Sequence, residues 1–160
     1  MATFLLGTAC LLDIARREGP AYDWYRGLEE QEGIFYPEVV ISAFSVVCLQ
    51  TQFAEEPPQT PRESVLKANV DTLISQFRLA DAIVGADPDV IQYWAENLNY
   101  DISYPSPGYP EDKLGFEEKL VLATAVVGNE GRGYILVDRR RDVHADLPLL
   151  LHDPYASSDA

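Results

Sequence analysis

Short continuous runs of apolar residues alternate along the chain with longer segments in which apolar residues recur every three or four positions. The runs at Phe4–Leu6, Val39–Ile41 and Tyr134–Val137 predict strands that are buried on both faces. A further run at Leu147–Leu151 predicts an edge strand. Strands that alternate with helices form a parallel sheet covered on both faces. The pattern therefore predicts a three-layer α/β domain with a central, mostly parallel sheet flanked by helices.

Capping residues, prolines and glycines mark the helix boundaries. Thr8 can cap a helix with its hydroxyl, so a helix is predicted from Thr8 to Arg17. The longest periodic segment runs from Arg62 to Val84 and predicts one long helix. Four further helices are predicted: after Gly19-Pro20, after the strand at Val39–Ile41, from Asp87-Pro88 to Asn97, and from Leu114 to Val127.

Length and composition indicate a globular protein. The chain has 160 residues, of which 47% are hydrophobic and 24% charged. This length and this hydrophobic content are enough to bury a core. We expect residues 1–155 to form a single domain and residues 156–160 a disordered tail. No apolar run approaches the roughly 20 residues of a membrane helix, and the start lacks the basic residues of an export signal. Cys10 and Cys48 are expected to be reduced thiols in a cytoplasmic protein.

The net charge of −14 bears on the choice of partner. Nucleic-acid binding draws on lysines and arginines that replace phosphate counterions, so this chain is expected to bind nucleic acid weakly at best. Its electrostatic field favours a basic protein partner. The dense cationic cluster of the sequence is Arg139-Arg140-Arg141.

A segment rich in tyrosine and proline, residues 100–112, separates two of the predicted helices. Tyr100, Tyr104 and Tyr109 supply apolar area together with a hydroxyl group, which makes them candidate contacts for a protein partner. Stacking of these rings on nucleic-acid bases is the alternative.

Four short motifs follow the predicted strands and open the last long helix: Gly7-Thr8-Ala9, Ser45-Val46-Val47-Cys48, Glu118 before an alanine-rich helix, and Asp138-Arg139-Arg140-Arg141-Asp142. Their order and spacing resemble the PIN family, which includes the VapC toxins of toxin–antitoxin pairs. The resemblance implies the fold of that family. Most members of the family are magnesium- or manganese-dependent ribonucleases, in which a cluster of carboxylates holds the metal and activates water.

The chain departs from the family pattern at four of these positions. Gly7 stands where the family has aspartate, Ala9 where it has asparagine, Cys48 where it has glutamate, and Arg140 where it has an acidic residue. Glycine, alanine and cysteine offer no hard anionic oxygen to a magnesium ion. The resemblance therefore implies a vacated active site.

Three carboxylates remain near the motifs: Glu118, Asp138 and Asp142. They are weak candidates for catalytic groups and for ligands of Mg²⁺ or Mn²⁺, and otherwise no cofactor is expected.

Arg140 and Cys48 each allow more than one interpretation. The Arg140 guanidinium could replace the metal and neutralise Glu118 or Asp142, it could belong to a solvated turn, or it could grip phosphate. Cys48 could be a packed thiol or a nucleophile, although no motif places a base beside it.

The sequence favours a PIN-like pseudoenzyme that binds or regulates a protein partner, with a second copy of the chain as one candidate. The alternative is a toxin-like metal-dependent ribonuclease with a reduced carboxylate site. Binding of a nucleotide or small molecule in the vacated pocket is a third hypothesis, which no glycine-rich phosphate loop supports.

Overall fold

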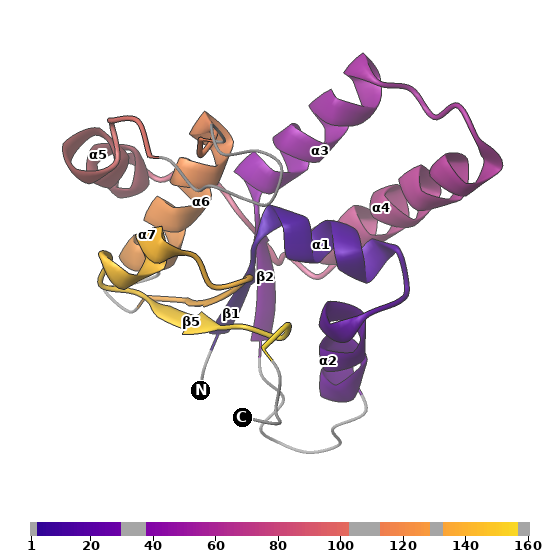
Figure 1. The fold of residues 1–160 in the computed structure, drawn as a ribbon, viewed down its shortest axis with the longest axis horizontal. Helices are drawn as coiled ribbons and strands as arrows, with labels where there is room; N and C mark the ends of the chain where they lie inside the picture. The colour runs from indigo at the N-terminus through magenta and orange to yellow at the C-terminus, as the bar shows by residue number, and fades with distance from the viewer. Residues whose placement is uncertain (1–2, 30–37, 103–112, 129–132, 157–160) are drawn as a thin grey trace.

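The computed structural model describes residues 3–29, 38–102, 113–128 and 133–156, and its centre is a five-stranded sheet (Figure 1). The strand order is β3-β2-β1-β4-β5, and every pairing is parallel. The strands are β1 (Thr3–Leu6), β2 (Glu38–Ser42), β3 (Ile83–Val84), β4 (Ile135–Val137) and β5 (Leu150–His152). The predicted parallel sheet is confirmed.

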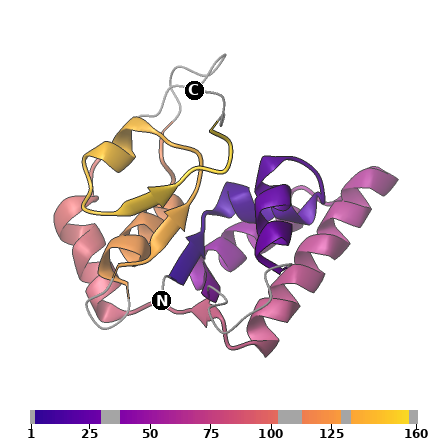
Figure 2. The ribbon, with the colours of Figure 1, turned by 90° about the horizontal axis from the view of Figure 1, so that it is seen from below.

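Seven helices within the described residues cover the sheet. They are α1 (Thr8–Ala15), α2 (Pro20–Glu29), α3 (Ala43–Glu55), α4 (Pro61–Leu79), α5 (Pro88–Asn97), α6 (Phe116–Val127) and α7 (Asp142–Ala145). Helix α1 contacts α2 and α4, whereas α6 contacts α5 and α3. Figure 2 shows the α1–α2–α4 group and the α5–α6 pair on opposite sides of the strands, so the three-layer architecture is confirmed.

The paired strands β1 and β4 are apolar because both of their faces are covered. Leu5, Leu6, Leu136 and Val137 are fully buried, and they pair across the β1–β4 ladder. Burial of such side chains contributes about 1.5–3 kcal/mol each relative to exposure. This packing fixes the register that places the carboxyl ends of β1 and β4 next to each other.

The prediction of one helix from Arg62 to Val84 is wrong at its carboxyl end. Helix α4 ends at Leu79, and Ile83–Val84 forms the edge strand β3. The break lies at Asp81, whose φ of 54° is left-handed and incompatible with a continuing helix. Ile83 continued the three- and four-residue spacing of the preceding apolar residues by coincidence. A strand of two residues is too short to show the alternation that would have identified it as a strand.

The prediction that Thr8 caps α1 is also wrong. Gly7 occupies the N-cap position without a side-chain cap, and Thr8 is the first helical residue. The Thr8 hydroxyl instead forms a 2.8 Å hydrogen bond with the hydroxyl of Ser45 on α3. Helix α1 ends at Ala15, before Arg17 adopts a φ of 60°.

Parts of the predicted loop and tail lie outside the described residues. Tyr104 and Tyr109 fall there, as do residues 157–160, whereas Tyr100 is described and 58% exposed. Among the described helices, none combines the length and apolar character needed to cross a membrane.

Candidate functional site

A pocket of about 630 Å³ lies at the carboxyl ends of β1 and β4. Residues directly after these strands form its base, and α1, α3, α6 and the 139–142 segment form its walls. Ligand sites in parallel α/β sheets lie beyond the carboxyl ends of the strands. The pocket is therefore the candidate functional site.

Gly7 and Asp138 are brought together by the parallel pairing of β1 with β4. Leu6 is the register partner of Val137, and the Gly7 N–H donates to the Val137 carbonyl at 2.9 Å. A Cβ atom at position 7 would lie 3.0 Å from both Cγ and Oδ2 of Asp138. The Asp138 carboxylate thus occupies space that a side chain at position 7 would need.

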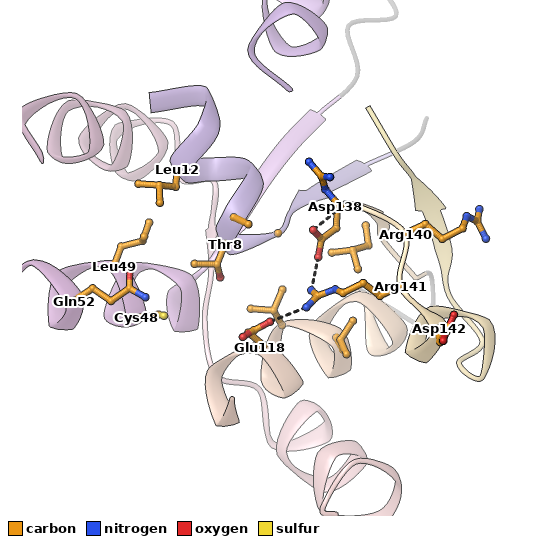
Figure 3. A pocket seen from close by; sticks show the side chains of 16 residues that line it. Thr8, Leu12, Cys48, Leu49, Gln52, Glu118, Asp138, Arg140, Arg141 and Asp142 are labelled. Carbon is orange, nitrogen blue, oxygen red and sulfur yellow. Dashed lines mark hydrogen bonds and ion pairs between the residues drawn. The ribbon is translucent and has the colours of Figure 1, made fainter. Parts of the chain in front are cut away.

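The Arg141 guanidinium lies between two of the three carboxylates that line the pocket, those of Glu118 and Asp138 (Figure 3). Its Nη1 donates to Glu118 Oε2 at 3.1 Å, and its Nη2 donates to Asp138 Oδ2 at 3.0 Å. Asp138 Oδ1 also accepts the Arg139 N–H at 2.7 Å. A single cationic side chain therefore joins α6 to the end of β4.

These three side chains are partly shielded from water, with exposed fractions of 22% for Arg141, 32% for Glu118 and 10% for Asp138. Burial alone would lower the pKa of Arg141. The charges of Asp138 and Glu118, together with the hydrogen bonds to both, outweigh burial and raise that pKa. The guanidinium is therefore a permanent cation at the base of the pocket.

The neutralising arginine is Arg141, not Arg140 as the sequence interpretation suggested. The Arg140 side chain is exposed and points away from Glu118 and Asp138, while its backbone N–H donates to Asp153 at 3.0 Å (Figure 3). The triple-arginine run was the correct signal. It could not show which arginine faces inward, because that depends on the turn after β4.

Asp142 does not join the other two carboxylates. It is exposed at the start of α7 and points away from the Arg141 bridge (Figure 3). Within the described part of the chain, no group of three or more His, Cys, Asp or Glu side chains is arranged to hold a metal ion.

The residues of the pocket do not fit the divalent metal that a nuclease of this fold would use. Gly7 and Ala9 have no ligating side chain, and Cys48 offers a thiol where a hard oxygen is needed. Glu118 and Asp138 already share a cation in Arg141. The donor set is therefore arranged around a guanidinium.

Helix α3 supplies the pocket wall opposite Arg141 with the adjacent residues Cys48 and Leu49 and, one turn further along, Gln52 (Figure 3). Burial raises the pKa of the half-buried Cys48 thiol, and the charges of Glu117 and Glu118 raise it further. Neither His144 nor His152 lines the pocket. Thiolate is the nucleophilic form of cysteine, so a raised pKa and the lack of a histidine in the pocket lining favour the packing interpretation of Cys48 over the nucleophile.

The segment that carries Arg141 is held from behind by the C-terminal turn. Asp153 accepts the Arg140 N–H, and Arg139 stacks over the Tyr155 ring at 4.4 Å from its centroid. The Tyr155 hydroxyl donates to Asp13 on α1. Residues at the end of the described chain therefore fix the position of the pocket wall, which no sequence motif indicated.

His144 completes the support of Arg141. Its Nδ1 accepts the Arg141 N–H at 3.0 Å, so the histidine is a capping residue of α7. Burial lowers the pKa of His144; the Asp138 charge opposes this effect, and Arg141 adds to it. The ring is held neutral with Nδ1 as the acceptor.

A scan of protein-family models and a search of curated proteins found no match to the sequence. Solved structures do match. The chain is similar to VapBC2 from Rickettsia felis bound to a DNA fragment from their promoter, with a TM-score of 0.63, 14% identity, and coverage of 94% of this chain and 97% of that one.

It is also similar to FitAcB from Neisseria gonorrhoeae, with a TM-score of 0.62, 18% identity and coverage of 95% and 98%. A third match is FitAB bound to the IR36 DNA fragment, with a TM-score of 0.58, 15% identity and 97% coverage of each chain. At these identities the likeness concerns the fold. The chain has a PIN-like fold of the VapC type, as the sequence motifs predicted.

Proposed function

We propose that this PIN-like fold acts as a pseudoenzyme, a protein-binding or regulatory module without nuclease activity. The observation that carries the proposal is the Arg141 bridge between Glu118 and Asp138. A guanidinium at 3.0–3.1 Å from both carboxylates supplies the positive charge that a metal would supply. It provides no activated water, because it has no coordination site to lower a water pKa.

The Gly7 substitution supports the same proposal. An aspartate at position 7 would bring a Cβ within 3.0 Å of the Asp138 carboxyl group. The present site therefore accommodates Asp138 in a position that the family's leading aspartate would block. Loss of a carboxylate at position 7 and the inward placement of Arg141 belong to one rearranged site.

The partner that fits this chain is a basic protein. The net charge of −14 disfavours direct binding to a polyanion, whereas VapBC2 and FitAB were solved bound to DNA fragments. An assembly of that kind would need its DNA-binding charge from the partner. The exposed Tyr100 remains a candidate partner contact, and so do Tyr104 and Tyr109; a second copy of the chain is a further candidate partner.

Cleavage assays on single-stranded RNA with Mg²⁺ or Mn²⁺ test the proposal. We expect no cleavage above that of the Glu118→Gln/Asp138→Asn variant, because the site lacks a metal ligand set. Asp142→Asn is the matched control, since it removes a carboxylate that lies outside the bridge. Metal-dependent cleavage that persists in the control and disappears in the double variant would overturn the proposal.

A metal-dependent ribonuclease with a reduced site is the second candidate. One observation favours it: Glu118 and Asp138 approach the same guanidinium, so without Arg141 they would face a common space. Calorimetric titration of Mn²⁺ into wild type and Arg141→Met separates the two functions. The pseudoenzyme predicts no binding to wild type, whereas the ribonuclease predicts binding to wild type and RNA cleavage that requires the metal.

A further inference from the structure

The Arg141 bridge leaves one negative charge without a partner. The single positive charge of Arg141 is shared by two carboxylates, those of Glu118 and Asp138. Both oxygens of Asp138 accept hydrogen bonds, from the Arg139 N–H and from Arg141 Nη2. Glu118 offers Oε2 to Arg141, whereas no hydrogen bond or ion pair from the described residues reaches its Oε1. Glu118 Oε1 is therefore the open acceptor of the bridge.

The other charged side chains of the pocket lie at its rim. Three arginines and three carboxylates line the pocket, so its charges balance as a whole. Arg139 stacks over the Tyr155 ring. Arg140 and Asp142 are exposed and point away from Glu118 (Figure 3). The rim thus has an excess of one positive charge that water screens, and the bridge has an excess of one negative charge inside.

Apolar side chains from three helices wall the pocket beside Glu118. Leu12 comes from α1, Leu49 from α3 and Leu122 from α6. The volume of about 630 Å³ is within the range of pockets that hold small molecules. The pocket therefore has room for a compact apolar body next to the open carboxylate oxygen.

Thr8 supplies a second acceptor at the base of the pocket. Its hydroxyl shares one hydrogen bond of 2.8 Å with the hydroxyl of the buried Ser45. A hydroxyl oxygen has two lone pairs, so at least one lone pair of Thr8 Oγ1 stays open whichever hydroxyl donates. Thr8 and Glu118 line the same pocket from α1 and α6 (Figure 3).

The charge of a ligand for this pocket follows from desolvation. An apolar body that fills the pocket removes water from the partly exposed Glu118. A neutral or anionic ligand would leave the excess negative charge of the bridge without water and without a partner, which costs free energy. A ligand with one positive charge compensates it, and the field of a chain with a net charge of −14 attracts such a ligand.

We propose that the pocket binds a small primary amine that carries one positive charge and an apolar body. The ammonium group donates to Glu118 Oε1 and Thr8 Oγ1, and the apolar body lies against the leucines of the three helices. The inference rests on the Arg141 bridge that carries the proposed function, and it adds a small ligand to the regulatory module.

Three probes that share a phenyl body and differ in the head group test the charge: phenethylamine, phenethyl alcohol and phenylpropanoate. Each is titrated into the isotope-labelled full chain and followed by backbone amide NMR. We expect saturable binding of the amine, with shifts in the parts of α1, α3 and α6 that line the pocket and with weaker binding as salt rises. The alcohol should bind about tenfold more weakly, and the carboxylate should not saturate.

Glu118→Gln removes the charge that selects a cation. It should weaken the amine by about tenfold and leave the alcohol bound no more weakly than in wild type. Glu117→Gln is the matched control, because it removes the neighbouring carboxylate of α6, which does not line the pocket; the amine affinity should change by less than about twofold. Thr8→Val keeps the bridge and should weaken the amine severalfold. The amide spectrum of each variant checks its folding.

Equal affinity for the amine and the alcohol, or tighter binding of the carboxylate, would overturn the inference. So would an amine affinity that neither Glu118→Gln nor Thr8→Val changes, shifts confined to residues outside the pocket, or no binding of any probe.

Failure of the amine and failure of the proposed function give different results. If the chain binds neither the amine nor Mn²⁺ and cleaves no RNA, the ligand is refuted and the pseudoenzyme stands. Mn²⁺ binding with metal-dependent RNA cleavage would refute the pseudoenzyme whatever the amine does.

Discussion

Gly7 and Asp138 are mutually adapted, because the Asp138 carboxyl group lies where a Cβ at position 7 would come within 3.0 Å of it. The contact follows from the β1–β4 register and not from a flexible loop. A substitution at either residue should therefore disturb the Arg141 bridge, since Asp138 Oδ2 is one of the two acceptors of the Arg141 guanidinium.

Gly7→Ala should lower the free energy of unfolding by about 1–3 kcal/mol, the usual cost of overpacking a filled site. Urea denaturation followed by circular dichroism measures the effect. Gly27→Ala is the control, since a Cβ there meets nothing within 4 Å and should be neutral or stabilising in α2. In an Asp138→Ala background, Gly7→Ala should lower the free energy of unfolding by less. An unchanged loss would mean that the added methyl group does not clash with Asp138.

Arg141→Met should destabilise the protein by on the order of 2 kcal/mol, because Glu118 and Asp138 then lose their shared cation while still partly buried. Arg140→Met removes an exposed side chain and should change stability by less than about 0.5 kcal/mol. Thermal unfolding of the two variants in the same buffer gives the comparison. Equal effects would mean that the bridge contributes nothing beyond a surface charge.

Both thiols should react slowly with iodoacetamide at pH 8. Burial raises the pKa of Cys10 to about 12, and burial also raises the pKa of Cys48. Cys48 is partly exposed and should be alkylated before Cys10, which is fully buried and should react only on unfolding. Mass spectrometry of Cys48→Ser and Cys10→Ser assigns the order. Alkylation of Cys48 faster than that of free cysteine would revive the nucleophile hypothesis.

Stability should fall as the pH drops below the ordinary histidine pKa of about 6.5. Burial lowers the pKa of folded His144, so the unfolded chain takes up a proton first and stability is lost from pH 6.5 down through the folded pKa. Above pH 6.5 this contribution is fully present. His144→Asn keeps an acceptor for the Arg141 N–H without titrating, so urea midpoints between pH 7.5 and 5 should vary less in that variant. An identical slope in both proteins would contradict the assignment.

The sequence predicted the parallel sheet and helices α1 to α6, because burial leaves a strong pattern, but it did not predict the four-residue helix α7. The runs around Leu5, Ile41 and Leu136 are apolar throughout, and each is a central strand. The edge strand at Ile83–Val84 was missed, since its two half-buried residues carry no such pattern.

The candidate site was predictable only in part. The motif positions located Gly7, Glu118 and Asp138 at one end of the sheet, where the pocket lies. The conformation of the 139–142 turn decides which arginine side chain reaches Glu118 and Asp138, and it directs Asp142 away from them. The contacts of Tyr155 with α1 and with Arg139 join segments that are distant in sequence. Local pattern carries no information about such contacts.

The central pairing of β1 with β4 has a consequence for synthesis of the protein. Phe4 emerges from the ribosome first, yet its partner Ile135 is among the last strand residues to follow. Until β4 is made, β1 has an open edge and the pocket has neither Asp138 nor Arg141. Pairing between such distant segments is slow because the chain must close a long loop first. A partner that binds this pocket therefore recognises only nearly finished chains, and it cannot engage the nascent protein earlier.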